Sequence, residues 1–312
     1  MAVERWSDKR TFLRDWKVVN EQLVVRGEFL LDLEFAKNWD KELEEMNNGK
    51  RGHPYEFPNS LIEFQAVLNQ WVNIRGIEGI TRKVEEYSII PNYNDYSSAF
   101  RRIQKLNVQI PPTKARKVSA STDGSGIKMS SRGEYREDKY GNKGPKKFLR
   151  VIITADPFTK NLLDCEVQVD GEGESEPHTA ITHLKKLLCE GVTIDKFWGD
   201  GAFDSKEMFN FLQKHGILAA IKIRENASSK ADGSFRRARE VKEYMEKGYK
   251  KWAMDKHYGR RWTGTEAIFS AVKGIFGEKT RSKYIPNMIL EVKRRFWAYQ
   301  RMKMYAEIKM HE

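Results

Sequence analysis

Three acidic residues have the types and surroundings needed for metal-dependent chemistry at phosphorus. Asp123 follows the extended run VSAST and precedes GSG, so we expect it to end a short strand where the chain turns. Asp200 ends the run IDKFWGD, and Glu266 lies at the start of TEAIFSAVKGIF, whose apolar spacing predicts a helix. Carboxylate oxygens are the ligands that hard cations such as Mg²⁺ prefer. A pair of such cations can stabilise both the attacking and the leaving oxygen of a displacement at phosphorus.

The order of the expected elements in residues 113–280 places these acids together. We expect strands at 118–122, 146–156, 161–169, 193–200 and 217–223, and helices at 178–191, at 205–216 and around Glu266. Three strands followed by helix–strand–helix–strand–helix resembles the order of the RNase H-like fold, an α/β fold with a mixed five-stranded sheet and flanking helices. In that order the first and fourth strands are neighbours, so Asp123 and Asp200 would lie side by side, with Glu266 brought across them.

Two acidic features nearby have simpler interpretations. Asp204 and Glu207 have the spacing of a capping box, which predicts that Asp204 caps the helix at 205–216. The acidic segment 170–176 is expected to be a solvated turn.

The N-terminal third is expected to be all helical. Residues 1–52 predict a helical extension, and residues 53–112 predict three short helices, within 61–75, 76–89 and 97–107. The third would face outward through three basic residues, with Phe100 and Ile103 inward; the basic residues are Arg101, Arg102 and Lys105. Three short helices with a basic third one are the outline of a helix-turn-helix module, which places its last helix in the major groove of DNA. A plain helical subdomain explains the same pattern equally well.

The charge of the chain favours an anionic partner. The formal net charge is +12. Residues 101–150 contain 14 Lys and Arg against 4 Asp and Glu, whereas residues 151–221 contain 6 against 12. Residues 222–261 are basic again, with 13 against 6. Basic blocks on both sides of an acidic one are what a DNA backbone passing a metal site would require. For any single block, a solvated surface is an equally good explanation.

Other features limit where the protein works. No apolar run approaches the ~20 residues of a membrane-spanning helix, and the first ten residues lack the apolar core of a signal peptide. We therefore expect a cytoplasmic protein without a membrane partner. Cys165 and Cys189 have the spacing of neither metal ligands nor a disulfide framework. Residues 281–312 predict a basic C-terminal helix that packs Phe296, Tyr299 and Met302 on the core and turns its basic face to DNA.

Three stretches resemble DDE transposases of bacterial and archaeal insertion sequences. They are STDGSGIKMS around Asp123, DKFWGDGAFDS around Asp200, and HYGRRWTGTEAIFSAVKGIFG around Glu266. The last is similar to the tyrosine–arginine–glutamate–lysine signature of many of these enzymes, with matching residues at Tyr258, Arg261, Glu266 and Lys273. Four residues separate Arg261 from Glu266, where the signature has three. The segment from GKRGHPYEF to FRRIQKL also resembles the helical DNA-binding part of such proteins.

The resemblance implies a transposase that binds the terminal inverted repeats of its own element and catalyses metal-dependent strand cleavage and strand transfer. Its partners would be double-stranded DNA, both repeat and target, and a second copy of the chain in a homodimer. Asp123, Asp200 and Glu266 would hold Mg²⁺ or Mn²⁺, two ions per site. Residues implied in DNA contacts are Lys273, Arg261, Tyr258, Arg101, Arg102 and Lys105. An aromatic side chain beside the site, with Trp198, Tyr258 and Trp262 as candidates, could stack on an unpaired base.

Two alternatives share part of this pattern. An RNase H-like, structure-selective nuclease would use the same carboxylates without strand transfer. A transposase-derived DNA-binding protein would have lost catalysis, for which a missing carboxylate would be the sequence sign. All three carboxylates are present here.

Overall fold

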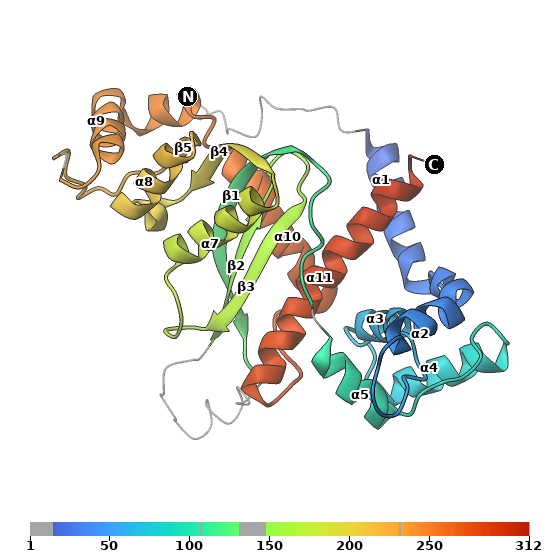
Figure 1. The fold of residues 1–312 in the computed structure, drawn as a ribbon. Helices are drawn as coiled ribbons and strands as arrows, with labels where there is room; N and C mark the ends of the chain where they lie inside the picture. The colour runs from blue at the N-terminus through green and yellow to red at the C-terminus, as the bar shows by residue number, and fades with distance from the viewer. Residues whose placement is uncertain (1–14, 107, 131–147, 231, 312) are drawn as a thin grey trace, which may run out of the picture. The chain divides into compact units, whose positions relative to one another are not determined.

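The computed structural model describes residues 15–106, 108–130, 148–230 and 232–311. The chain forms two compact units (Figure 1). The first contains Met1–Ile103 and Arg301–Glu312, and the second contains Gln104–Gln300. This division differs from the four expected segments, because most of the C-terminal helix belongs to the second unit.

The first unit is helical in all the elements that the structure describes. Its N-terminal part consists of α1 (Trp16–Glu28), the short 3₁₀ helices η2 (Phe29–Leu31) and η3 (Glu34–Asn38), and α2 (Trp39–Asn47). The three helices predicted next are α3 (Asn59–Leu68), α4 (Ile74–Glu86) and α5 (Tyr96–Lys105). Two side-chain caps determine where helices begin: Asn73 accepts a hydrogen bond from the Gly76 amide at the start of α4, and Asp95 accepts from the amides of Ser97 and Ser98 at α5.

The second unit is built on the predicted mixed sheet of five strands. The strands are β1 (Lys117–Lys128), β2 (Phe148–Ala155), β3 (Leu162–Val169), β4 (Thr193–Gly199) and β5 (Leu218–Ile221). Their order in the sheet is β3-β2-β1-β4-β5. β1 pairs antiparallel with β2 and parallel with β4, and β5 is parallel to β4. The RNase H-like order expected from the sequence is therefore confirmed.

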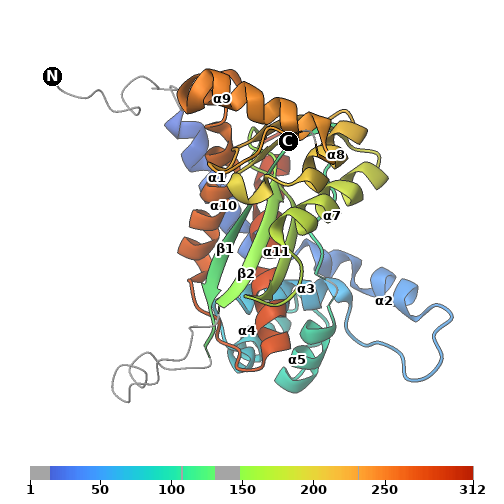
Figure 2. The same cartoon turned by 90° about the vertical axis from the view of Figure 1, so that its left-hand side faces the viewer.

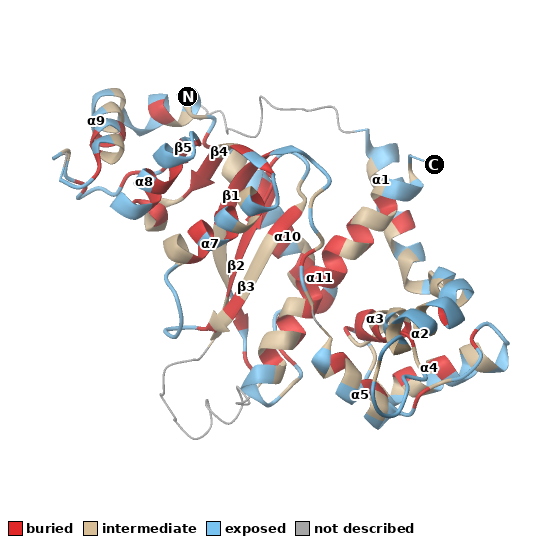
Figure 3. Cartoon of the chain, viewed as in Figure 1, coloured by how far each residue is buried: buried red, intermediate tan, exposed pale blue. Residues whose placement is uncertain are grey.

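Helices cover both faces of this sheet (Figure 2). The helices α7 (Glu176–Cys189) and α8 (Lys206–Lys214) pack on one face, and α10 (Arg260–Phe276) packs on the other. The long helix α11 (Ile285–Lys309) contacts α10 through Phe296 and Phe269, whose ring centroids are 5.9 Å apart. The strands and the inner sides of these helices are buried (Figure 3). One helix was not expected: α9 (Phe235–Asp255) lies in the basic stretch, and Gly248 interrupts it with a φ of 68°.

β1 is longer than the sequence predicted, and Asp123 lies within it. The predicted turn at DGSG does not form, because residues 121–128 continue the antiparallel ladder with β2, in which Asp123 is paired with Ile153. Pairing with β4 ends earlier, at Ser121 and Trp198. The prediction that Asp123 ends β1 was wrong, but Asp123 does lie just past the end of the β1–β4 pairing.

Asp204 is not a helix cap, which corrects a second expectation. Ser205 caps α8 by accepting a hydrogen bond from the Met208 amide. The buried Asp204 carboxylate instead accepts from Arg237 of α9 at 2.6 and 3.0 Å and from the Arg224 amide at 3.1 Å. Asp204 therefore joins the segment after β4 to the segment after β5.

The C-terminal helix packs as predicted, but part of its basic surface is inside the protein. Phe296, Tyr299 and Met302 are buried. Arg294 and Arg295 are also buried, and Arg295 donates to the Gly277 and Lys279 carbonyls and to Glu291. The expectation that this basic face meets DNA is therefore wrong for these two arginines, since their guanidinium groups are enclosed by protein. No helix in the described ranges is long and apolar enough to cross a membrane.

Replacing Glu291 is expected to destabilise the fold strongly. Its buried carboxylate accepts from Arg295 and from the amides of Arg281 and Ser282, which connect α10 to α11. Glu291→Ala leaves buried arginine charge without its anion, which costs about 3–5 kcal/mol. Urea unfolding followed by circular dichroism measures the loss.

A control on the same helix is Lys293→Gln. Lys293 pairs with the partly exposed Glu166 at 3.1 Å, an interaction worth less than about 1 kcal/mol. Equal losses in the two variants would contradict the role given to Glu291.

Candidate active site

Asp123 is held in a partly enclosed position between β1 and α10. Its side chain is 17% exposed, its Oδ1 accepts from the Gly124 amide at 3.0 Å, and its Oδ2 accepts from Arg261 at 3.1 Å. Burial raises the pKa of the Asp123 carboxyl above its usual value; Arg261 opposes this, and the charges of Asp200 and Glu266 raise it further. Asp123 thus lies close enough to Asp200 and Glu266 for their charges to disfavour its ionised form.

Asp200 lies directly after β4, as expected. It begins the short 3₁₀ helix η4 (Gly201–Phe203) and accepts from the Ala202 amide at 2.7 Å. Arg224 donates to the Gly201 and Ala202 carbonyls at 2.6 and 3.0 Å, so the segment after β5 fixes the turn that orients Asp200.

Glu266 lies on α10 and faces the solvent more than Asp123 does. Its side chain is 57% exposed, and its Oε1 is 3.9 Å from the guanidinium of Arg261. Arg261 itself is only 12% exposed. Arg261 therefore lies between Asp123 of β1 and Glu266 of α10. The extra residue between Arg261 and Glu266, relative to the family signature, does not prevent this arrangement.

Lys273 reaches the same edge of β1 from the last turn of α10. Its Nζ donates to Ser125 Oγ at 2.9 Å, and Ser125 is two residues after Asp123, on the same face of the strand. The structure thus brings together Asp123, Glu266, Arg261 and Lys273, with Asp200 within electrostatic reach.

Tyr258 supports the end of β4 from inside the protein. It is 4% exposed, packs with Trp198 and Trp252, and its hydroxyl donates to the Gly199 carbonyl at 3.2 Å. Burial also raises the pKa of its hydroxyl. The expectation that Tyr258 contacts DNA does not fit this burial; its position suits orientation of the residue that precedes Asp200. Trp198 is buried too, whereas Trp262 is half exposed.

A fourth carboxylate near the site was missed from the sequence. Glu176 is the first residue of α7 rather than part of a solvated turn, and it is half buried. Burial raises the pKa of Glu176; Arg150 opposes this, and the charges of Asp200 and Asp123 raise it further. The acidic run 170–176 gave no local signal that distinguished Glu176, because its approach to Gly124 of β1 arises only in the folded chain.

Basic and aromatic side chains line a cavity of about 600 Å³ beside Asp200. Its cations come from Lys222, Arg224 and Arg261, and its aromatic surface from Tyr249, Tyr258 and Trp262. Cations can bind phosphate oxygens and an exposed aromatic face can stack on a base, so this cavity has the chemistry to receive part of a nucleic acid.

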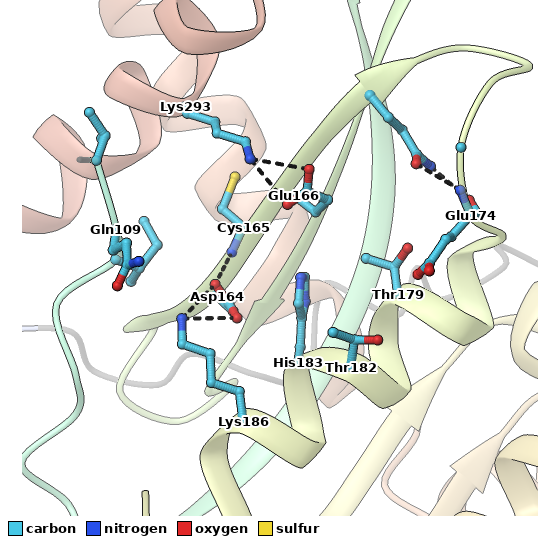
Figure 4. A pocket seen from close by; sticks show the side chains of 14 residues that line it. Gln109, Asp164, Cys165, Glu166, Glu174, Thr179, Thr182, His183, Lys186 and Lys293 are labelled. Atoms are coloured by element: carbon cyan, nitrogen blue, oxygen red, sulfur yellow. Dashed lines mark hydrogen bonds and ion pairs between the residues drawn. The ribbon is translucent and has the colours of Figure 1, made fainter. Parts of the chain in front are cut away.

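A second cavity, between β3 and α7, contains none of the three predicted carboxylates (Figure 4). Its charges are paired across it: Lys186 with Asp164 at 3.2 Å and Lys293 with Glu166 at 3.1 Å. The buried His183 interacts with Thr154 at 2.9 Å. Because these charges are paired with each other and His183 is hydrogen-bonded, these side chains stabilise the fold, and we do not assign this cavity a catalytic role.

The predicted DNA-binding residues of α5 differ in position. Arg101 and Lys105 are exposed, and Arg101 donates only to its own helix, at the Ser97 carbonyl, among the bonds described for it. Arg102 is half buried and donates to the Phe57 carbonyl and, at 2.7 Å, to Asn59. The outward position predicted for Arg102 is wrong, because it joins α5 to the start of α3. Ile103 is buried as expected, but Phe100 is 43% exposed.

The donor chemistry of the site fits divalent cations. Three carboxylates interact electrostatically at one edge of the sheet, and burial makes the charged form of Asp123 unfavourable without a nearby cation. In the described part of the chain no three acidic, histidine or cysteine side chains already surround a single point. The guanidinium of Arg261 supplies positive charge between Asp123 and Glu266.

The fold and the site define a protein of the RNase H-like class with one acidic residue on β1, one directly after β4 and one on α10. Two family models described as "Transposase DDE domain" match the chain, one over residues 116–300 and one over residues 24–132. The first match covers more than half of the 312 residues. The chain therefore belongs to the family of transposases with a DDE domain.

Solved structures give weaker similarities. A piggyBac transposase synaptic complex with hairpin DNA matches at 11% identity over 92% of this chain and 75% of that chain, with a TM-score of 0.44. A simian T-cell lymphotropic virus intasome in complex with PP2A regulatory subunit B56 gamma matches at 13% identity, over 64% and 60%, with a TM-score of 0.23. A pre-cleavage Mos1 transpososome matches at 8% identity, over 83% and 80%, with a TM-score of 0.22. These similarities are too low to add to the family match.

Removing the charge of Asp123 is expected to stabilise the protein in the absence of divalent cations. Because the folded-state pKa is raised, the protonated form favours folding, and this contribution is lost as the pH rises through the folded-state pKa. Asp123→Asn should therefore unfold at a higher temperature than the wild type at neutral pH. The difference should shrink as the pH falls toward the unfolded value of about 3.9.

Thermal unfolding in the presence of a chelator, at several pH values, measures this difference. Asp170→Asn is the control, because Asp170 is an exposed residue of the turn after β3 and should leave the midpoint unchanged. A lower midpoint for Asp123→Asn at neutral pH would contradict the prediction.

Proposed function

We propose that this protein is an active transposase that cleaves DNA at the terminal inverted repeats of an insertion sequence and joins the freed end to target DNA. The observation that supports this most is the meeting of Asp123, Glu266 and Arg261 across β1 and α10, with Asp200 at the end of β4, inside the segment matched by the DDE domain model. All three carboxylates of that class of site are present, which disfavours a family member without catalysis.

In the proposed reaction, Asp123, Asp200 and Glu266 would hold Mg²⁺ or Mn²⁺, with two ions in the site. Such ions, when bound, lower the pKa of the attacking hydroxyl and neutralise charge on the phosphate. Water breaks the phosphodiester at the element end and leaves a 3′-hydroxyl. That hydroxyl then replaces the leaving oxygen of a target phosphodiester, so the number of phosphodiester bonds is conserved in the second step.

The protein's own cations are assigned to the phosphates. Arg261 already lies between two carboxylates, and Lys273 reaches β1 two residues beyond Asp123, so both can contact a phosphate that enters there. The cavity beside Asp200 adds Lys222 and Arg224, and the half-exposed Trp262 offers a face for an unpaired base. Since two element ends must be held together for transposition, we propose a homodimer in the DNA complex.

Loss of one carboxylate is expected to abolish both steps. Asp123→Asn and Glu266→Gln should each reduce cleavage and strand transfer at least about 10²-fold, because charge stabilisation at the reacting phosphate is lost. The measurement uses a labelled duplex with the inverted repeats that flank the reading frame, a marked target duplex, and Mg²⁺ or Mn²⁺.

Glu278→Gln is the matched control, since Glu278 is an exposed acid just beyond the same helix and should retain activity. Full activity of Asp123→Asn or Glu266→Gln would exclude the proposed site. Cleavage without any transfer to the marked target would instead favour the structure-selective nuclease.

Two neighbouring arginines of α5 are expected to have different effects. Arg101→Gln removes an exposed cation, so binding to duplex DNA should weaken and the slope of log affinity against log salt should fall by about 1. Arg102→Gln removes the bonds to the Phe57 carbonyl and to Asn59, so it should cost about 1–3 kcal/mol of unfolding free energy and leave the salt slope unchanged.

Electrophoretic mobility shifts at several salt concentrations, together with urea unfolding, separate these effects. An unchanged salt slope for Arg101→Gln would remove α5 from the proposed DNA contacts. A reduced slope with normal stability for Arg102→Gln would show that its bonds to Phe57 and Asn59 do not determine its role.

A further inference from the structure

The Glu176 carboxylate lies against the main chain of β1 at the residue that follows Asp123. A Cβ atom placed on Gly124 would be 2.6 Å from Glu176 Oε1, shorter than real Cβ contacts, and 3.0 Å from its Cδ, which is tighter than most of them. The absence of a side chain at Gly124 is what allows Glu176 to approach this closely. By contrast, a Cβ on Gly126 would have its closest contact with Phe148, at 3.6 Å, an ordinary distance.

Glu176 reaches this point from the opposite face of the sheet to Arg261 and Glu266. Successive residues of a strand point to opposite faces. Asp123 and Ser125 contact α10 through Arg261 and Lys273, and the intervening Gly124 faces α7. The sheet does not separate the two sides here, because β4 ends at Gly199. Asp200, just beyond that end, interacts electrostatically with both Asp123 and Glu176.

We propose that Glu176 is a fourth carboxylate of the cation site, which approaches Asp123 and Asp200 from the α7 face through the space left by Gly124. The proposal rests on the proposed function, since it concerns the same cations. Asp123 and Glu266 share Arg261 as a counter-charge, whereas Glu176 and Asp200 have no described ion pair. Glu176 thus contributes an anionic oxygen donor on the side of the site that Arg261 does not neutralise.

Mn²⁺ binding to the full chain without DNA tests the proposal independently of activity. Free Mn²⁺ is measured by its electron paramagnetic resonance signal during a titration. Glu176→Gln should weaken Mn²⁺ binding about tenfold or more. Gly124→Ala should weaken it similarly without removing any charge, because the new methyl group displaces the flexible end of Glu176.

The combined variant makes the test specific. If Gly124→Ala acts through Glu176, adding it to Glu176→Gln should cause no further loss, so the two effects are not additive. Gly126→Ala and Glu174→Gln are the controls. The first adds a methyl group two residues along the same strand with ordinary contacts, and the second removes an exposed carboxylate two residues before Glu176. Both should bind Mn²⁺ as the wild type does.

The outcomes separate this inference from the proposed function. If Asp123→Asn weakens Mn²⁺ binding and Glu176→Gln does not, the fourth carboxylate is excluded and the proposed function stands. If neither substitution has an effect, or the wild type binds no Mn²⁺ at millimolar concentrations, both are overturned. A lower unfolding midpoint with unchanged Mn²⁺ affinity in Glu176→Gln would assign Glu176 to a structural interaction with Arg150 and overturn the inference.

Discussion

The parallel pairing of β1 with β4 is the constraint on which the rest of the site depends. It brings together two segments that are more than 70 residues apart in the sequence, and it ends at Ser121 and Trp198 while β1 continues along β2. Because β1 stays paired with β2 after its pairing with β4 has ended, Asp123 lies on a strand that has a neighbour on one side only. Asp200 follows at the point where the main chain leaves the sheet, after Gly199, whose carbonyl accepts hydrogen bonds from the Tyr258 hydroxyl and the Lys222 amide.

The placement of acids at this edge lowers stability, and the surrounding structure offsets that cost. Burial and neighbouring carboxylates both make the charged form of Asp123 unfavourable, and Arg261 compensates in part. The bonds that fix the site lie outside it: Asp204 joins Arg237 and the Arg224 amide, and Glu291 joins α10 to α11. The hydrogen-bonded charges of Asp204 and Glu291 stabilise the elements around the site. This offsets the unfavourable charge of Asp123, as expected where function rather than stability determines which residues are present.

The sequence predicted what depends on local pattern and missed what depends on tertiary contacts. Strand order, the three helices after residue 58 and the place of Asp200 follow from alternation, helical spacing and turn residues. The extension of β1 through Gly124 was missed, because a turn-forming DGSG can be kept extended by a neighbouring strand such as β2. Arg102 and Arg295 resemble surface cations in sequence. Only the fold shows that each guanidinium donates to main-chain carbonyl oxygen, at Phe57 for Arg102 and at Gly277 for Arg295. Glu176 was missed for the same reason.

The geometry also explains why the spacing between Arg261 and Glu266 can differ from the family signature. If the arginine were positioned by the glutamate along the helix, one inserted residue would turn it by about 100° and separate them. Arg261 is instead positioned from outside the helix. Its guanidinium bonds to Asp123 on β1, and its carbonyl lies 3.4 Å from Ser121 Oγ. The contact across to the strand fixes the arginine, and the more exposed Glu266 approaches it to 3.9 Å. The position of Arg261 therefore depends more on its contacts with β1 than on the number of residues between it and Glu266 along α10.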